Sequence, residues 1–179
     1  MMSPEELKQL IRTIPDFPSA GIQFRDITTL IGHRAGFAAS VRHIADRARS
    51  IGAQSIAGME ARGFIFGAAV AAKLDLGFVP VRKPGKLPME VIGIDYALEY
   101  GTDRLEMDPG AVSAGENVVI VDDLIATGGT ALAAAELLRQ AGAKVDHALF
   151  VIDLPDLGGA QKLREAGVDV RTLMEFEGD

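Results

Sequence analysis

Hydrophobic residues along the chain fall into short β-branched runs that alternate with longer segments of helical spacing. We predict buried strands from the runs at residues 55–59, 78–81, 117–121, 144–153 and 168–174. The segments with apolar residues three and four positions apart, as in amphipathic helices, are residues 33–52, 63–76, 128–142 and 156–167. Strands that alternate with helices of this length indicate βαβ units. The pattern therefore predicts an α/β fold with a mainly parallel central sheet flanked by helices.

The pattern changes in three places. Before the first strand, Ser3, Pro4 and Glu6 have the spacing of a capping box, which predicts a short N-terminal helix. Residues 13–32 are rich in proline and are expected to be irregular, and residues 91–107 alternate like a hairpin. Ligands of open α/β sheets bind beyond the carboxyl ends of the strands, so both segments are candidates for substrate contact, for a dimer contact or for a passive cap.

Composition and charge narrow the class of protein. The 179 residues suffice for one well-filled core and fall short of two comfortable domains. A net charge of −7 disfavours non-specific binding to nucleic acid or to an anionic membrane. The absence of cysteine excludes disulfides, zinc–cysteine sites and a thiol nucleophile. No apolar run reaches membrane-spanning length and the N-terminus does not resemble a signal peptide, so we expect a cytoplasmic protein.

The stretch VVIVDDLIATGGT, residues 118–130, places two carboxylates beside a loop suited to an anion. Asp122 and Asp123 would lie at the carboxyl edge of the sheet, and Gly128 would begin the next helix, where free backbone N–H groups favour a phosphate. Thr127 and Thr130 can add hydroxyl donors. Turn chemistry with helix capping is the alternative interpretation. A kinase-type phosphate loop is disfavoured because no lysine follows the glycines, and a dinucleotide fingerprint is absent.

Two carboxylates would repel a bare phosphate, whereas they suit neutral hydroxyl groups or a metal. A ligand with a phosphate at one end and a diol in its middle is a ribose 5-phosphate. The stretch resembles the thirteen-residue 5-phosphoribosyl pyrophosphate (PRPP) motif of type I phosphoribosyltransferases. That resemblance implies a Rossmann-like core in which Asp122 and Asp123 hold the ribose hydroxyls. The 5′-phosphate would be cradled by Ala126, Thr127, Gly128, Gly129 and Thr130.

The acceptor is suggested by a second resemblance. PDFPSAGIQFRDIT, residues 15–28, is similar to the N-terminal hood of the family members that act on adenine, and the segments 58–71, 79–88 and 96–107 agree with it. One domain is implied, with the N-terminal helix and base-binding hood at residues 1–32 and the core at 33–179, which includes a flexible flap at about 91–107.

The implied reaction transfers the phosphoribosyl group from PRPP to adenine and yields AMP and pyrophosphate. Mg²⁺ would be held mainly by PRPP, with Asp122 and Asp123 as possible aids, and a homodimer is the family expectation. Nucleic acid and membrane partners are not expected. The alternatives are transfer to another base (hypoxanthine, guanine, xanthine or a pyrimidine) or a PRPP-sensing regulator without catalysis.

Within the hood, Phe24 is suited to stacking on a purine while the main chain of Gln23 and Arg25 reads the purine edge. Residues alone leave Phe24 equally suited to a core anchor. Arg25 is either a base contact or a structural partner of Asp26.

Four cations are expected near pyrophosphate by resemblance to the family: Arg62, Arg82, Lys83 and Lys86. Charged loops are more often simply solvated, which is the alternative for the last three. Glu60 either orients Arg62 or caps the following helix.

Glu99 and Tyr100 belong to the flap, and by resemblance Glu99 would manage the proton on the purine imidazole. Charge alternation alone favours a solvent-facing carboxylate there. His33 departs from the family pattern and is expected to cap the helix that follows it.

Overall fold

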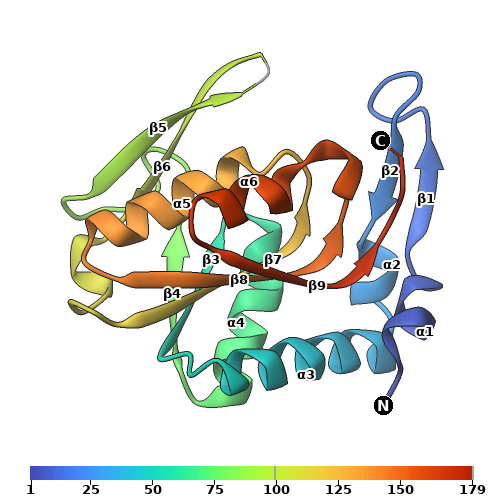
Figure 1. Ribbon diagram of the computed structural model, residues 1–179, viewed down its shortest axis with the longest axis horizontal. Helices are drawn as coiled ribbons and strands as arrows, with labels where there is room; N and C mark the ends of the chain where they lie inside the picture. Colours follow the sequence, from blue (N-terminus) through green and yellow to red (C-terminus); the bar gives the residue numbers. More distant parts are fainter. Residues whose placement is uncertain (99, 179) are drawn as a thin grey trace.

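The structure is a computed structural model that describes residues 1–98 and 100–178. A parallel five-stranded sheet of order β4-β3-β7-β8-β9 lies at its centre (Figure 1). The strands are β3 (Ser55–Met59), β4 (Gly77–Val81), β7 (Asn117–Ile125), β8 (Lys144–Asp153) and β9 (Asp169–Glu175). The predicted α/β class is confirmed, because all five predicted strands are present and pair in parallel.

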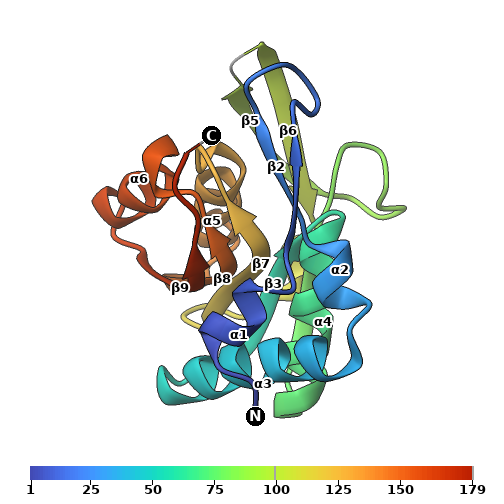
Figure 2. The same ribbon diagram turned by 90° about the vertical axis from the view of Figure 1, so that its right-hand side faces the viewer.

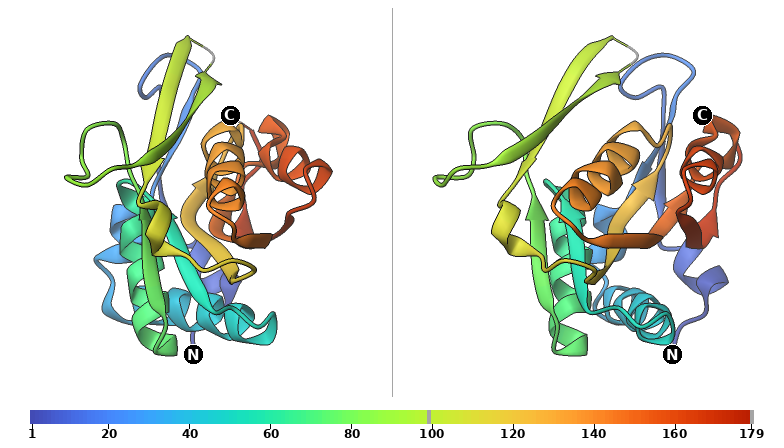
Figure 3. Two further views of the ribbon diagram at one scale, coloured as in Figure 1. Left: turned by 90° about the vertical axis from the view of Figure 1, so that its left-hand side faces the viewer. Right: turned by 60° about the vertical axis from the view of Figure 1, so that its left-hand side comes forward.

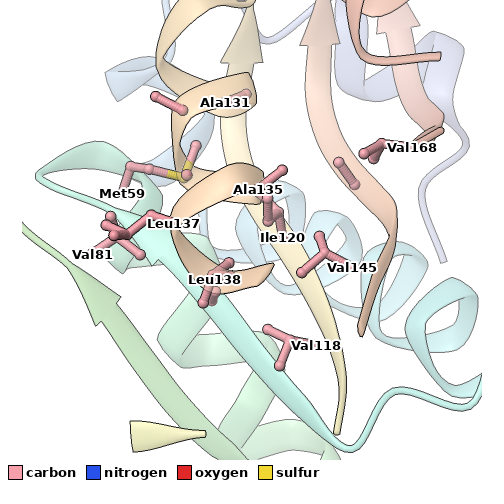
Figure 4. Close-up of a cluster of buried hydrophobic side chains, with 14 of the residues drawn as sticks. Met59, Val81, Val118, Ile120, Ala131, Ala135, Leu137, Leu138, Val145 and Val168 are labelled. Atoms are coloured by element: carbon pink, nitrogen blue, oxygen red, sulfur yellow. The ribbon is translucent and has the colours of Figure 1, made fainter. Parts of the chain in front are cut away.

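Helices cover both faces of the sheet (Figure 2). They are α3 (Arg34–Ser50) and α4 (Arg62–Leu74) on one face, and α5 (Gly129–Gln140) and α6 (Gly159–Glu165) on the other. A short 3₁₀ turn, η2 (Pro155–Leu157), precedes α6. The apolar face of α5 supplies Ala131, Ala135, Leu137 and Leu138 to the core, where they meet the sheet residues Val118, Ile120 and Val145 (Figure 4). This packing fixes the N-terminus of α5 at the carboxyl edge of the sheet.

Strand β7 is longer than predicted. The pattern predicted its end at residue 121, directly before the two acids, whereas the ladder continues to Ile125. Its neighbour β8 runs equally far, and Asp122 pairs with Phe150 while Ile125 pairs with Asp153. The paired acids therefore belong to the strand and are held by its backbone ladder, and the loop begins only after Ile125.

The segment expected to be irregular forms a small hood with its own sheet. It contains β1 (Arg12–Pro15), β2 (Gln23–Asp26) and α2 (Thr28–Ile31), so the prediction of irregular structure was wrong. An ion pair joins Arg12 to the buried Asp26. Hydrogen bonds from Thr28 and Arg12 hold the pKa of Asp26 at about 2. The antiparallel pairing of β1 with β2 and the ion pair of Arg12 with Asp26 hold this segment in regular structure despite its prolines.

The two predicted caps are confirmed. Helix α1 (Pro4–Lys8) begins with the capping box of Ser3 and Glu6. The His33 ring accepts a hydrogen bond from the Gly36 backbone N–H at 3.0 Å and caps α3.

The predicted hairpin is confirmed as β5 (Ile92–Leu98) and β6 (Gly101–Met107), followed by the 3₁₀ turn η1 (Pro109–Ala111). Its base packs on α5 through the buried Leu105 and Met107, and its tip extends past the carboxyl edge of the sheet (Figure 3). None of the helices in the described part of the chain is long and apolar enough to cross a membrane.

Candidate active site

A cavity of about 460 Å³ opens at the carboxyl ends of the central strands. Three separate parts of the chain line it: residues 59–62 after β3, Lys83 after β4, and residues 122–131 from β7 into α5. The structure therefore brings together the acidic pair, the expected phosphate loop and two of the four expected cations.

Asp122 and Asp123 lie side by side at this edge with different environments. The Asp122 carboxylate accepts the backbone N–H of Asp123 at 2.8 Å, and Asp123 is almost fully buried. Burial, followed by the neighbouring charge of Asp123, raises the pKa of Asp122 well above its ordinary value, although Arg62 and that backbone hydrogen bond oppose the rise. A ligand that brings hydroxyl donors or a cation to such a carboxylate stabilises its ionised form.

Gly63 has no side chain, and this leaves space for the Asp122 carboxylate. A Cβ on Gly63 would lie 2.8 Å from Oδ1 of Asp122, closer than real Cβ contacts come. Gly63 follows Arg62 in the first turn of α4, so the same turn admits the carboxylate and presents the guanidinium. The two expected subsites are thus built against each other.

Arg62 is paired with Asp123. Its Nε lies 2.7 Å from Oδ2 of Asp123, and the arginine side chain is 54% exposed while that of Asp123 is 5% exposed. The guanidinium therefore neutralises the buried acid from the cavity side and keeps part of its surface open to a ligand.

The loop after β7 has the geometry of an anion cradle. Gly128 has a φ of +80° and is the N-cap of α5, so the first backbone N–H groups of a twelve-residue helix face the cavity edge. The loop packs tightly on α6, where the Gly159 N–H donates to the Ala126 carbonyl at 2.9 Å. A Cβ on Gly128 would lie 2.8 Å from Gly159 Cα. Both glycines are needed for this close approach.

Lys83 reaches the cavity as part of a network with the hairpin. Its ammonium pairs with Asp103 and donates to the Tyr96 hydroxyl at 3.2 Å, which also accepts a hydrogen bond from Thr130 at 3.2 Å. Burial lowers the pKa of Lys83, but the hydrogen bonds to Asp103 and Tyr96 outweigh it, so the pKa is raised overall. The hydrogen bond from Lys83 lowers the pKa of Asp103.

Sequence reasoning missed Tyr96 and Asp103. They are cross-strand partners in the β5–β6 register, at equal distances from the turn. The alternation in residues 91–107 contained this signal, because pairing across a tight turn would have placed the two side chains opposite each other.

The remaining expected cations lie outside the cavity lining. Arg82 donates to the Glu60 carboxylate at 3.1 Å, which also accepts the Lys83 backbone N–H at 2.9 Å. These contacts lower the pKa of Glu60, with the Lys83 backbone hydrogen bond as the largest cause. Glu60 thus holds the basic loop in place, a role different from the two expected for it. Lys86 is exposed on the same loop.

The hood residues also lie outside the cavity lining. Phe24 is half-buried and meets Phe17 edge-on at 5.1 Å between ring centroids. Within the described chain β2, which begins at Gln23, pairs only with β1, so its outer edge has no strand partner. The partner of Asp26 is Arg12 rather than Arg25.

The guanidinium of Arg25 is engaged by the C-terminal tail. It donates to the Glu177 carbonyl at 3.1 Å and to the Thr13 hydroxyl at 2.7 Å, and it lies 4.7 Å from the centroid of the Phe176 ring. The Phe176 N–H in turn donates to the Asp153 carbonyl at the end of β8. The tail therefore joins the hood to the central sheet, which the sequence pattern gave no reason to expect.

Two expected flap residues remain. Glu99 lies outside the described residues. Tyr100 is 91% exposed at the hairpin tip.

The donors around the cavity suit an ion that is shared with a ligand. Residues 1–98 and 100–178 contain no group of three or more His, Cys, Asp or Glu side chains placed to hold an ion. The cavity does present the Asp122 carboxylate, and protein sites for Mg²⁺ commonly combine one or two carboxylates with substrate phosphates. The donor set fits an ion that arrives with a polyphosphate.

Comparison with known proteins decides the family. Residues 31–172 match the family model described as a phosphoribosyl transferase domain. The adenine phosphoribosyltransferase of Erythrobacter litoralis is 72% identical over 177 residues, which cover 99% of both chains. This chain belongs to the adenine phosphoribosyltransferase family.

Solved structures agree with this family over nearly the whole chain. The adenine phosphoribosyltransferase of Thermoanaerobacter pseudethanolicus is 48% identical, with a TM-score of 0.92 over 97% of this chain and 100% of its own. The enzyme from Saccharomyces cerevisiae, solved with an imino-altritol bisphosphate and adenine, is 41% identical with a TM-score of 0.88 over 96% of this chain and 98% of its own. The type I phosphoribosyltransferase fold implied by the motif is thereby confirmed.

Proposed function

We propose that the protein transfers the 5-phosphoribosyl group of PRPP to adenine and releases AMP and pyrophosphate, a purine-salvage reaction. One observation carries the proposal. Asp122 and Asp123 line the same cavity as the glycine-capped N-terminus of α5. Few ligands need two acids and an anion cradle within one cavity of about 460 Å³, and a ribose 5-phosphate is one of them.

In this proposal the acids accept hydrogen bonds from the ribose 2′- and 3′-hydroxyls. The backbone N–H groups of Gly128, Gly129 and Thr130, with those of Ala126 and Thr127, receive the 5′-phosphate. The helix dipole of α5 adds favourable charge at that end. The ligand is thus held at its diol and at its phosphate, which fixes the orientation of the ring and with it the position of C1.

Displacement of pyrophosphate from C1 builds positive charge on the sugar ring, as glycosyl transfer generally does. Arg62 and Lys83 line the cavity and would neutralise the departing pyrophosphate. Lys86 and Arg82 belong to the same basic loop and would act from its outer side. Mg²⁺, when bound with PRPP, would supply further charge neutralisation at its phosphates, with Asp122 and Asp123 as the nearest protein ligands.

Adenine would enter on the hood side. The unpaired edge of β2 would offer main-chain donors and acceptors at Gln23 and Arg25, and Phe24 a stacking surface. The adenine-bound structure of the yeast relative supports an adenine site in this family. The Arg25 side chain would act indirectly, because its guanidinium is engaged by the tail.

Glu99 remains the proposed proton acceptor for the purine imidazole on the strength of the motif alone. General acid–base assistance is typically worth ~10²–10⁴-fold in rate, so Glu99→Ala is expected to lose turnover by about that factor while PRPP still binds. Unchanged turnover would remove this role. The family expectation of a homodimer and the prediction of a cytoplasmic location belong to the same proposal.

A panel of free bases tests the proposal against its rivals. The protein is incubated with PRPP and adenine, hypoxanthine, guanine or xanthine, with and without Mg²⁺, and nucleotides are separated by chromatography. AMP from adenine, dependent on Mg²⁺, is expected to exceed the other products strongly. A preference for an oxopurine would establish the alternative substrate, and no nucleotide from any base would favour a PRPP-sensing regulator. The double variant Asp122→Asn with Asp123→Asn should raise the KM for PRPP strongly.

A further inference from the structure

The β5–β6 hairpin is tied to the cavity by one hydrogen-bond network. Asp103 and Tyr96 face each other across the two strands. The Tyr96 hydroxyl donates to Asp103 at 3.1 Å, and both groups hold the ammonium of Lys83. Tyr96 also accepts the hydroxyl of Thr130 at the start of α5. A basic loop, the phosphate cradle and the hairpin therefore meet at one point.

Asp103 is a negative charge beside a cation that the proposed reaction needs for pyrophosphate. The Lys83 side chain is 36% exposed, and its ammonium has three donors on a flexible stem. A carboxylate and a polyphosphate would compete for the same ammonium, and the polyphosphate carries more charge.

We propose that Asp103 is a positioning residue that holds Lys83 in the free protein, yields it to the polyphosphate of PRPP or pyrophosphate, and takes it back as pyrophosphate leaves. The hydrogen bonds of Tyr96 change with this exchange, because its hydroxyl contacts Lys83, Asp103 and Thr130 together. Tyr96 thereby links the exchange at Lys83 to the start of α5. Asp103 thus lowers the affinity for the product, which speeds its release. The inference rests on the proposed function in one respect, which is that the ligand is a polyphosphate.

The hairpin supplies its own matched control. Asp95 and Arg104 pair in the β5–β6 register one position from Tyr96 and Asp103, so their side chains lie on the opposite face. Arg104 contacts Asp95 at 3.1 Å and Glu106 at 3.0 Å. Asp95→Asn therefore removes the same charge from the same hairpin without touching Lys83.

Tyrosine emission measures the exchange directly. The chain has two tyrosines and no tryptophan, so Tyr100→Phe leaves Tyr96 as the single emitter. A carboxylate that accepts the phenol hydrogen bond quenches tyrosine emission. We expect inorganic pyrophosphate with Mg²⁺ to change the Tyr96 emission saturably, with a midpoint equal to the dissociation constant from calorimetry. Calorimetric binding without any change in emission would overturn the exchange.

Affinity for inorganic pyrophosphate provides the second test. A partly exposed ion pair contributes only weakly, so Asp103→Asn should tighten pyrophosphate binding by about two- to fivefold and should lower kcat and KM for PRPP together. Asp95→Asn should change none of these, and Asp103→Glu should restore unaltered behaviour. Weaker or unchanged pyrophosphate binding in Asp103→Asn, with its thermal midpoint close to that of Asp95→Asn, would contradict the proposal.

If Asp103→Asn does not fold, the emission titration of the Tyr100→Phe protein decides alone. AMP formation by the unaltered chain tests the proposed function separately. Failure of that assay with a positive emission titration would therefore reject the reaction and keep the lysine exchange.

Discussion

The guanidinium of Arg62 lies 2.7 Å from the buried carboxylate of Asp123. The sequence assigned these two residues to opposite ends of the reaction, the arginine to pyrophosphate and the acid to the ribose diol. Their contact means that the cation already neutralises the acid before any ligand arrives. The ribose and pyrophosphate subsites therefore share one pair of opposite charges. A substitution of either residue should weaken ligand binding at both subsites.

Replacement of Arg62 by glutamine tests this shared balance. It removes a cation from the cavity and leaves Asp123 buried without its partner, so we expect the KM for PRPP to rise about tenfold or more, which corresponds to ~1.4 kcal/mol. Inhibition by pyrophosphate should weaken in parallel. Arg49→Gln is the control, because Arg49 pairs with Asp46 on the exposed surface of α3. Unaltered PRPP saturation in steady-state kinetics would count against the assignment.

Gly63→Ala tests the placement of Asp122. The added Cβ would lie 2.8 Å from Oδ1 of Asp122, so the carboxylate must move and PRPP binding should weaken severalfold. The higher helix propensity of alanine offsets part of the cost of moving the carboxylate, so the thermal midpoint should change little. Gly77→Ala, where the added Cβ meets nothing within 4 Å, is the matched control. Equal PRPP affinity of the two variants by calorimetry would disprove the crowding.

Asp122→Asn should raise the free energy of unfolding while it weakens PRPP binding. The pKa of Asp122 is higher in the folded than in the unfolded chain, so this group costs stability at a pH above both values. That cost shrinks as the pH falls through the folded pKa and is gone below the unfolded one. The variant should therefore be more stable at pH 7, by on the order of 1 kcal/mol, and the gain should shrink on acidification. Urea unfolding at several pH values measures this.

The control for that experiment is Asp169→Asn, an exposed acid paired with Arg171. A loss of stability in Asp122→Asn at pH 7 would show that the carboxylate is a favourable element of the free protein. PRPP binding by Asp122→Asn should be weakened in either case.

Phe176→Ala tests the link between the C-terminal tail and the hood. The Phe176 ring lies under the guanidinium of Arg25, and the tail accepts its hydrogen bond at Glu177. Removal of the ring should loosen the hood, so the KM for adenine should rise severalfold while the KM for PRPP changes little. Lys8→Ala removes the second cation over the ring and leaves the contact between Arg25 and Glu177 in place. Equal changes in both KM values would indicate a general loss of folding.

The periodicity of apolar residues was sufficient for the central sheet and for the hairpin, because buried strands and helix faces repeat with a fixed period. It failed where the hydrogen-bond ladder decided the outcome. Asp122 and Asp123 continue β7 since β8 pairs with them, and no local pattern contains that information.

The sheet of the hood and the contact between the hood and the C-terminal tail were not predicted, for a related reason. The β1–β2 pairing overrides the prolines of residues 13–32. The contact of Arg25 with Glu177 joins residues from the two ends of the chain, so no local pattern contains it. The acids were predicted to lie at the sheet edge from their place after a buried strand, and Arg62 and Lys83 were expected near them by resemblance to the family motifs; all four residues line the cavity. Tyr96 and Asp103 were missed because their importance comes from their partners.

The central claim is that the cavity joins a phosphoribosyl group to adenine. Its most direct test is the simultaneous measurement of AMP and pyrophosphate formed from adenine and PRPP with Mg²⁺, by the unaltered protein and by the double variant Asp122→Asn with Asp123→Asn. We expect equimolar AMP and pyrophosphate from the unaltered protein and a strongly reduced yield from the variant at low PRPP. Pyrophosphate without AMP, or an equal yield from the two proteins, would contradict the account.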